Sequence, residues 1–251
     1  MRLSIGSLIF FIVSLSPTLI SNYGPQKEFF VVWNVGQGQW ATFVKTDRCV
    51  HFDIGGEHFP ARKLKKTCGE KDNVILLSHW DWDHISFAGR ARRLLPRSCM
   101  GQAPVGQSTP RKMKLIEAYR PCAQFPVEAR NIYRAEENSQ GSNEKSNVFI
   151  ADAQILVPGD SPSTQEKVWD QQELISTTRI LLLGHHGSRG STSNDLLDKT
   201  INLKIAVASA RFRKYGHPHI EVTERLQQHH VPLLRTEDWG NIWLELPPPK
   251  I

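Results

Sequence analysis

The sequence lacks any CxxC pair, although it contains four cysteines, Cys49, Cys68, Cys99 and Cys122. A zinc ribbon, which is built from such pairs, is therefore excluded. Four cysteines fit an oxidising compartment and allow up to two disulfides in three alternative pairings. Proximity along the chain favours Cys49 with Cys68 and Cys99 with Cys122.

Charge is almost absent from the first 21 residues, where Arg2 is the only charged side chain. An apolar stretch occupies residues 8–20, and a polar stretch follows it. This pattern predicts a secretory signal peptide, with a retained N-terminal membrane anchor as the alternative. The folded part, expected to be a single domain over residues 28–248, should therefore lie in the periplasm or outside the cell.

Acidic residues are absent from residues 90–114, which contain seven cations: Arg90, Arg92, Arg93, Arg97, Arg111, Lys112 and Lys114. Such a run predicts an anion-facing surface, with an ordinary solvated face as the alternative. The formal charge of the chain, +6, agrees with an anionic partner such as nucleic acid. The apolar pattern weakens over the same part of the chain, so residues 90–142 are interpreted as a basic insertion.

No internal repeat is apparent, and strand-like apolar runs alternate with helix-like stretches. We expect strands at residues 29–33, 41–44, 50–54, 74–77, 148–157, 180–183, 205–208, 233–235 and 242–246, and helices at 193–199 and 222–229. This alternation predicts a layered α/β domain.

The run at residues 74–77 is followed by four potential metal ligands within six positions: His79, Asp81, Asp83 and His84. In an extended turn, neighbouring side chains can diverge toward two metal positions, one using His79 with Asp81 and the other Asp83 with His84. Closely packed aspartates would repel one another without a cation. The alternative, a solvated acidic turn, does not explain the preceding buried strand.

Two further apolar runs end in ligand-type residues. Asp160 follows residues 155–157, and His185 and His186 follow residues 180–183. Loops at one edge of a layered α/β sheet converge on a common site, so we expect these groups to meet the first cluster.

The ordered set of motifs resembles the metallo-β-lactamase superfamily, specifically its ComEC-type branch. That branch includes the extracytoplasmic domain of the bacterial competence DNA-uptake channel. The matching elements are HxDxDH at residues 79–84, NVGQGQ at 34–39, DIGG at 53–56, Asn143 with Ser146, GD at 159–160, HHGS at 185–188 and GHP at 216–218.

The resemblance implies a four-layered αββα sandwich that binds two divalent metal ions, zinc or manganese. It implies that His79, Asp81, Asp83 and His84 are ligands, that Asp160 bridges the ions and that His185 completes the second site. His186 is then left for substrate phosphate or proton transfer. No histidine occurs between His84 and His185, and Asp81 stands where many relatives carry histidine; both departures favour harder ions such as manganese or magnesium.

A metal-activated water makes hydrolysis the expected chemistry, with Asp83, His186 and His217 as catalytic residues. His186, Ser188, Ser191 and His217 can donate to phosphate, and Arg211, Arg213 and Lys214 can contact a nucleic-acid backbone without reading its sequence. We therefore expect a DNA phosphodiesterase or nuclease. The alternatives are a hydrolase of lactam, ester or cell-wall substrates, and a DNA-binding accessory protein with a degenerate site.

Two tryptophans, Trp80 and Trp82, alternate with the ligands. Either could stack on a base, but a tryptophan beside a buried strand is more often a core residue.

Overall fold

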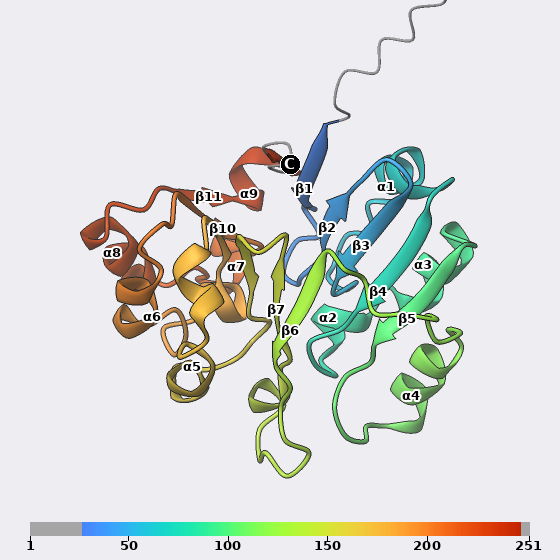
Figure 1. Cartoon of the computed structure of the whole chain (residues 1–251), viewed down its shortest axis with the longest axis horizontal. Coiled ribbons are helices and arrows are strands. Elements are labelled where there is room, and N and C mark those ends of the chain that lie inside the picture. The colour runs from blue at the N-terminus through green and yellow to red at the C-terminus, as the bar shows by residue number, and fades with distance from the viewer. Residues whose placement is uncertain (1–26, 247–251) are drawn as a thin grey trace, which may run out of the picture.

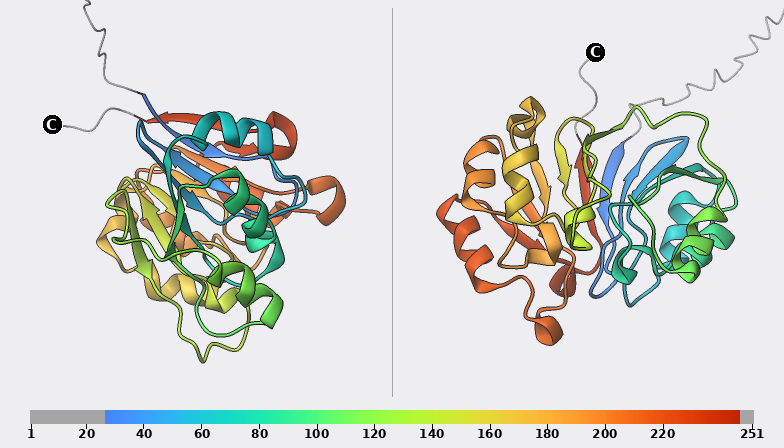
Figure 2. Two further views of the ribbon diagram at one scale, coloured as in Figure 1. Left: turned by 90° about the vertical axis from the view of Figure 1, so that its right-hand side faces the viewer. Right: turned by 90° about the horizontal axis from the view of Figure 1, so that it is seen from below.

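The structure, a computed structural model, describes residues 27–246 as two six-stranded sheets packed between two layers of helices (Figure 1, Figure 2). The expected four-layered αββα class is confirmed. Residues 1–21, for which a signal peptide or anchor is predicted, lie outside the described residues. Among residues 27–246, none of the helices combines the length and apolarity needed to cross a bilayer.

The first sheet has the strand order β12-β1-β2-β3-β4-β5. Its strands are β1 (Glu28–Val32), β2 (Ala41–Val44), β3 (Arg48–Phe52), β4 (Asp72–Leu76), β5 (Ser98–Gln102) and β12 (Ile242–Leu246). The second sheet has the order β11-β10-β9-β8-β7-β6. Its strands are β6 (Ala129–Tyr133), β7 (Val148–Ala151), β8 (Ile155–Val157), β9 (Ile180–Leu182), β10 (Ile205–Ala208) and β11 (Leu233–Arg235).

Helices cover the outer face of each sheet (Figure 2). Those beside the first sheet are α1 (Ala61–Cys68), α3 (Ala88–Leu94) and α4 (Pro110–Glu117). Those beside the second are α5 (Ser163–Trp169), α6 (Asn194–Lys199) and α8 (Ile220–Gln228). Three one-turn helices lie near loops: α2 (Trp82–Ile85), α7 (Phe212–Tyr215) and α9 (Thr236–Trp239).

The central strands read as continuous apolar runs because both of their faces are buried. In β1, Phe30 and Val32 point into the core between the two sheets, whereas Val31 points into the core beneath the helices of the first sheet. Successive side chains of a strand point to opposite faces, so each residue of such a run belongs to one of two cores. A third core packs the second sheet against its own helices.

Most predicted strands occur within two residues of their expected positions, and β2, β10, β11 and β12 match fully. The run at residues 148–157 differs, because it forms the antiparallel pair β7 and β8 rather than one strand. The reversal takes place at Asp152 and Ala153, whose φ values are 48° and 52°. Aspartate adopts the left-handed region more readily than most residues, which permits this turn.

Residues 90–142, interpreted above as a basic insertion, are part of the sandwich itself. They supply β5 at the edge of the first sheet and β6 at the edge of the second. Ile116 and Tyr119 belong to the core of the first half, and Ala129 belongs to the core between the sheets. This segment therefore connects the two halves of the fold instead of decorating its surface.

The two disulfides have the pairing that chain proximity favours. Cys49 of β3 is bonded to Cys68 of α1, and Cys99 of β5 is bonded to Cys122. The first bond fixes an outer helix to a central strand, and the second fixes the connection between the two sheets.

Candidate metal centre

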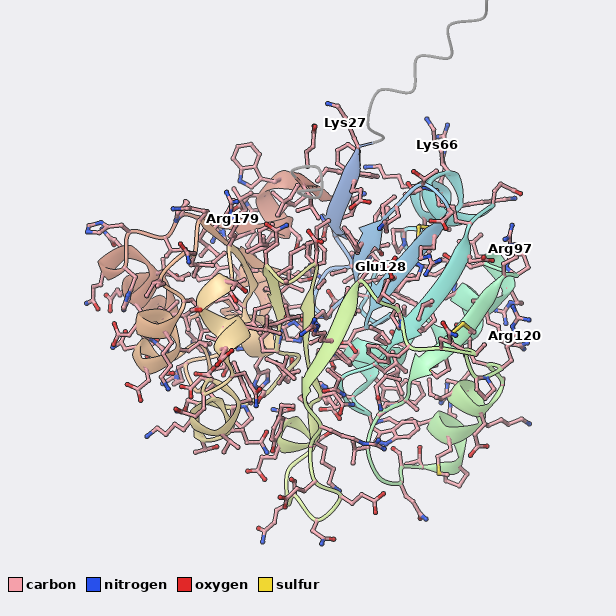
Figure 3. All side chains as sticks on the ribbon, viewed as in Figure 1. Lys27, Lys66, Arg97, Arg120, Glu128 and Arg179 are labelled. Carbon is pink, nitrogen blue, oxygen red and sulfur yellow. A yellow bond between two sulfur atoms is a disulfide. The ribbon has the colours of Figure 1, made fainter. Side chains whose placement is uncertain are left out.

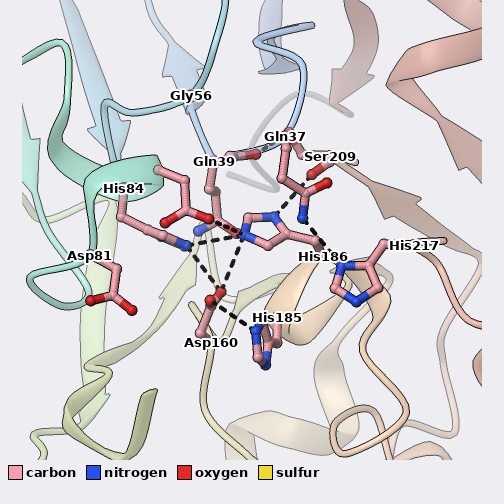
Figure 4. A network of polar contacts seen from close by, with 12 residues as sticks. Gln37, Gln39, Gly56, Asp81, His84, Asp160, His185, His186, Ser209 and His217 are labelled. Atoms are coloured by element: carbon pink, nitrogen blue, oxygen red, sulfur yellow. Dashed lines mark hydrogen bonds and ion pairs between the residues drawn. The ribbon is translucent and has the colours of Figure 1, made fainter. Parts of the chain in front are cut away.

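Ligand-type side chains from three strand ends meet at one edge of the sandwich (Figure 4). His79 and the short helix α2, which carries Asp83 and His84, follow β4. Asp160 follows β8, and His185 with His186 follows β9. The structure thus brings together all six predicted ligands, including residues more than 100 positions apart in the chain.

Asp160 lies at the centre of this cluster, and its two oxygens face different histidines. Oδ1 is 3.0 Å from Nε2 of His84 and 3.7 Å from Nε2 of His186. Oδ2 is 3.8 Å from Nε2 of His79 and 3.7 Å from Nε2 of His185. A single buried carboxylate therefore joins two sets of potential ligands.

The first set, called here the inner group, consists of Asp83, His84, His186 and Asp160. One ligand atom from each of these residues lies within 4.8 Å of the others. Nε2 of His84 and Nε2 of His186 are 3.3 Å apart. Two nitrogens bound to one tetrahedral zinc ion would be about 3.3 Å apart, so this spacing suits a shared cation.

The second set, called here the outer group, consists of His79, Asp81 and His185 around the other oxygen of Asp160. Nε2 of His79 lies 3.5 Å from Asp81 Oδ2. Asp81 is also more open to solvent than His79, and its Oδ1 accepts a hydrogen bond from Ser142 at 2.6 Å. The outer group therefore offers the same two histidines and two carboxylates as the inner group, but it is looser and more open to solvent.

His186, and not His185, occupies the position beside Asp83 and His84 that the resemblance implies for His185. His186, expected to serve substrate or proton transfer, is buried in the inner group with its Nε2 at 3.2 Å from Asp83 Oδ2. His185, expected to complete the second site, lies beside Asp160 on the side of His79. His185 is thereby placed to supply a histidine to the group around His79, for which the sequence offers none between His84 and His185.

Three histidines present the same ring atom to Asp160 because their other nitrogen is held by a fixed partner. Nδ1 of His84 is 2.8 Å from Asp53 Oδ2, and Nδ1 of His186 donates to the carbonyl oxygen of Ser209 at 3.0 Å. Nδ1 of His79 lies 2.9 Å from Ser78 Oγ. Partners of this kind fix the orientation of metal-binding imidazoles.

Asp53 is the organising residue behind the cluster, although sequence reasoning gave it no role beyond the DIGG motif. Its buried carboxylate also accepts from Gln39 Nε2 at 2.8 Å and from the Ser78 amide at 2.7 Å. A carboxylate in place of Gln39 would stand against Asp53, so the amide relieves a like-charge contact. The DIGG motif itself was the signal that could have identified Asp53.

The backbone of the DIGG motif packs directly against the backbone of α2. A Cβ on Gly55 would lie 2.4 Å from the carbonyl oxygen of Asp83, which is closer than side chains tolerate. Glycine therefore lets the Ile54 amide donate to the His84 carbonyl at 2.8 Å.

The turn that carries the two later histidines has a strained backbone. His185 and His186 have φ values of 47° and 56°, a region that residues other than glycine occupy rarely. Each such residue costs on the order of 1 to 3 kcal/mol and persists where the surroundings determine it. Here the strained turn directs the two consecutive imidazoles to opposite oxygens of Asp160.

The arrangement of layers matches solved structures. The metallo-beta-lactamase fold protein YhfI from Bacillus subtilis superposes with a TM-score of 0.58 at 9% identity, covering 87% of this chain and 100% of that one. The chain has the metallo-β-lactamase fold. A diphosphatase from the PhnP family gives a TM-score of 0.53 at 13% identity, covering 89% of this chain and 99% of that one.

Sequence comparison relates this metallo-β-lactamase-fold chain to proteins named for competence and recombination. It is 27% identical over 228 residues to competence protein ComA of Neisseria gonorrhoeae, covering 85% of this chain and 32% of that protein. It is 25% identical over 234 residues to recombination protein 2 of Haemophilus influenzae, covering 83% of this chain and 28% of that protein. The chain spans about a third of the length of these curated relatives, and no family model matches it. The resemblance to ComEC-type proteins is confirmed.

The charged groups of the candidate metal centre shift one another's pKa values. Burial disfavours ionisation of Asp160, yet the imidazoles of His84 and His186 hold its pKa well below the usual range. Burial likewise opposes the charged form of His84, but Asp160 and Asp53 raise its pKa. The pKa of His186 is raised against burial by Asp160 and Asp83. Positive charge is therefore stabilised beside Asp160, where a cation would displace the protons.

The pKa values of Asp81, Asp83 and His185 are all shifted downward. Contact with His79 lowers the pKa of Asp81. Burial would raise the pKa of Asp83, but the hydrogen bond from His186 and the charge of His84 lower it. The pKa of His185 is lowered chiefly by burial. Both aspartates and His185 thus favour the deprotonated forms that bind metals.

The donor set fits a divalent cation. Nε2 of the buried His79 lacks a hydrogen-bond partner among residues 27–246, which would cost on the order of 1 to 3 kcal/mol without a ligand. Histidine nitrogens and carboxylate oxygens together suit zinc or manganese.

The residues predicted to bind substrate divide into different environments. His217 is half-buried near the centre, where its ring centroid lies 6.0 Å from that of His185. Ser188 is partly exposed in the turn after the two histidines. Ser191 is fully buried and donates to the carbonyl oxygens of Gly184 and Ser188, so it holds the histidine turn and does not face a substrate.

The three cations near α7 are not equally available. Arg211 and Lys214 form ion pairs with Glu57 at 2.9 and 2.8 Å, whereas Arg213 is exposed on the same helix. A nucleic-acid backbone would therefore have to compete with Glu57 for Arg211 and Lys214, whereas Arg213 has no such competitor in these ion pairs.

The seven cations of residues 90–114 are spread over several surfaces. Arg97 pairs with Asp72 at 2.7 Å, at the end of β4 remote from His79, and points outward (Figure 3). Arg90 packs on the ring of Phe59. Arg111 and Lys112 lie over Trp82 beside the metal centre.

Proposed function

We propose that this chain is an exported metal-dependent phosphodiesterase that cleaves DNA. The observation that supports it most strongly is the inner group, in which four potential ligands from three strand ends converge within 4.8 Å. Such a set at a sheet edge is arranged for metal-assisted hydrolysis. The names of the sequence relatives, which refer to competence and recombination, favour DNA as the substrate.

Two divalent ions, zinc or manganese, would be held by the two groups around Asp160. Asp83, His84 and His186 would hold one ion, and His79, Asp81 and His185 the other, with one oxygen of Asp160 serving each. When bound, such ions supply Lewis acidity and an activated water at neutral pH.

His217 is well placed to donate a hydrogen bond to a phosphate oxygen. Its Nδ1 lies 3.2 Å from Nε2 of Gln37, which can only donate, so Nδ1 accepts and the proton is on Nε2. Oε1 of Gln37 accepts from the Arg211 amide at 3.1 Å, which fixes the orientation of the Gln37 amide. Burial and the neighbouring histidines, His186 first, lower the pKa of His217 to about 4, so the ring is neutral at pH 7.

Export is supported by the two disulfides, which form and persist in oxidising compartments. The apolar stretch at residues 8–20 adds to this support. Periplasmic or secreted localisation, with or without a retained anchor, is part of the proposal. The mass of the N-terminus of the exported protein tests whether residues 1–21 are removed.

The test of the activity is turnover of single- and double-stranded DNA by protein loaded with zinc or manganese. We expect cleavage by the wild type and a loss of at least 100-fold in Asp83→Ala, because one ligand of the inner group is removed. Asp198→Ala, an exposed aspartate on α6, is the matched control and should retain activity. Hydrolysis of the lactam nitrocefin without DNA cleavage would overturn the proposal in favour of a different hydrolase.

A further inference from the structure

A cleft of about 330 Å³ opens directly beside Asp83 of the metal centre. Two aromatic side chains, Trp82 and Tyr215, line it. Trp82 belongs to α2 in the first half of the sandwich, and Tyr215 belongs to α7 in the second half. The cleft therefore lies across the junction of the two halves.

Trp82 is exposed although the tryptophan two residues before it is buried. Trp80 is 9% exposed and donates to the carbonyl oxygens of Val105 and Gly106, so it is the core residue of the pair. Trp82 is 39% exposed. The guanidinium of Arg111 and the ammonium of Lys112 lie 5.1 and 5.3 Å from its ring centroid. These cation–π contacts hold the indole at the surface and leave it accessible from the cleft.

Tyr215 is fixed on the other side by its hydroxyl group. It is 43% exposed, and its hydroxyl donates to Glu57 Oε1 at 3.0 Å. Glu57 is itself held by Arg211 and Lys214. The ammonium of Lys214 lies 4.8 Å from the Tyr215 ring centroid. Both rings are therefore exposed, yet oriented by charged neighbours.

We propose that this cleft is a nucleobase subsite, in which a base packs against Trp82 and Tyr215 while its phosphate lies at the metal centre. Aromatic walls bind any base, because every base has a π-face, so the subsite selects nucleotides without selecting sequence. Arg111 and Lys112 add positive charge for a neighbouring phosphate. The inference rests on the proposed function, since it assumes a nucleic-acid substrate.

The test compares binding of thymidine 5′-monophosphate and 2-deoxyribose 5-phosphate to zinc-loaded protein. The two probes share a phosphate and a sugar, but only the first carries a base. We expect the base to improve the affinity of the wild type by roughly 5- to 150-fold, the range that stacking provides. Trp82→Ala should lose most of this difference in affinity, and Trp82→Phe should retain part of it. The single variant Tyr215→Ala should also bind the two probes with a smaller difference in affinity than the wild type.

Trp239→Ala is the matched control, because Trp239 is 70% exposed on α9 and does not line the cleft. Its discrimination between the two probes should equal that of the wild type. Equal binding of both probes by the wild type, or full discrimination by Trp82→Ala, would overturn the subsite.

The two proposals fail differently. Protein that prefers the nucleotide but does not cut DNA retains the subsite and refutes the nuclease. Protein that cuts DNA but binds both probes equally refutes the subsite alone.

Discussion

Asp53 Oδ2 lies 2.8 Å from Nδ1 of His84, and both side chains are buried. The carboxylate requires a proton on Nδ1, so Nε2, which lies 3.0 Å from Asp160 Oδ1, is the nitrogen that can give up its proton to a cation. A residue outside the candidate ligand set thus determines which nitrogen of His84 would bind a cation.

Replacing Asp53 by asparagine should weaken metal binding while keeping the shape of the site. The amide can donate to Nδ1, which would move the imidazole proton to Nε2 and block the ligand atom. We expect zinc affinity to fall about 10- to 100-fold, measured by competition with a chromophoric chelator. Asp152→Asn, at the turn between β7 and β8, is the matched control; an equal loss there would show a general effect of the substitution.

The two consecutive histidines should have separable effects on metal content. We expect two ions per wild-type chain and one in His186→Ala, because the inner group loses a buried ligand 3.2 Å from Asp83. His185→Ala should retain the inner ion and lose the other more readily, since only contacts around the outer group change. Elemental analysis after dialysis measures both. His58→Ala, at an exposed histidine, should keep two ions, and identical metal content in His185→Ala and His186→Ala would contradict the division into groups.

Much of the site was predictable because ligand residues interrupt the sequence where buried strands end. His79, Asp160 and His185 each follow an apolar run, and the fold brings these ends to one edge. The choice between His185 and His186 was not predictable, because it depends on a left-handed turn that periodicity does not reveal. The edge strands β5 and β6 were missed for a related reason: they are only partly buried, so polar residues weaken their apolar pattern.

The contribution of Arg111 and Lys112 to DNA binding should appear in its salt dependence. Each contact between a cation and a phosphate contributes about 0.9 to the slope of log affinity against log salt on duplex DNA. Arg111→Gln with Lys112→Gln should therefore reduce the magnitude of this slope by up to about 2, measured by fluorescence anisotropy. Arg62→Gln with Lys63→Gln on α1 removes two exposed cations elsewhere (Figure 1) and should leave the slope unchanged. Equal slopes for both double variants would exclude a phosphate contact at α4.

A buried histidine remote from the metal centre should make stability depend on pH. His51 Nδ1 accepts from Trp40 Nε1 at 3.1 Å and lies 2.9 Å from Thr42 Oγ1, while Nε2 donates to Asn73 Oδ1 at 2.9 Å. Every partner suits the neutral ring, and burial lowers the pKa of His51 to about 4. Between pH 6.5 and 4 the unfolded chain therefore binds a proton that the folded protein does not.

The stabilisation from His51 should be complete above about pH 6.5 and lost as the pH falls toward 4, by up to about 3 kcal/mol. Urea unfolding between pH 4.5 and 7 measures it as the difference between the wild type and His51→Gln. Glutamine can still donate to Asn73 but does not titrate, so the variant should be less stable at pH 7 and have a flatter pH profile. The metal-centre groups titrate in both proteins and cancel in the comparison. His58→Gln should reproduce the wild-type profile, and parallel profiles for wild type and His51→Gln would show that this histidine does not control acid stability.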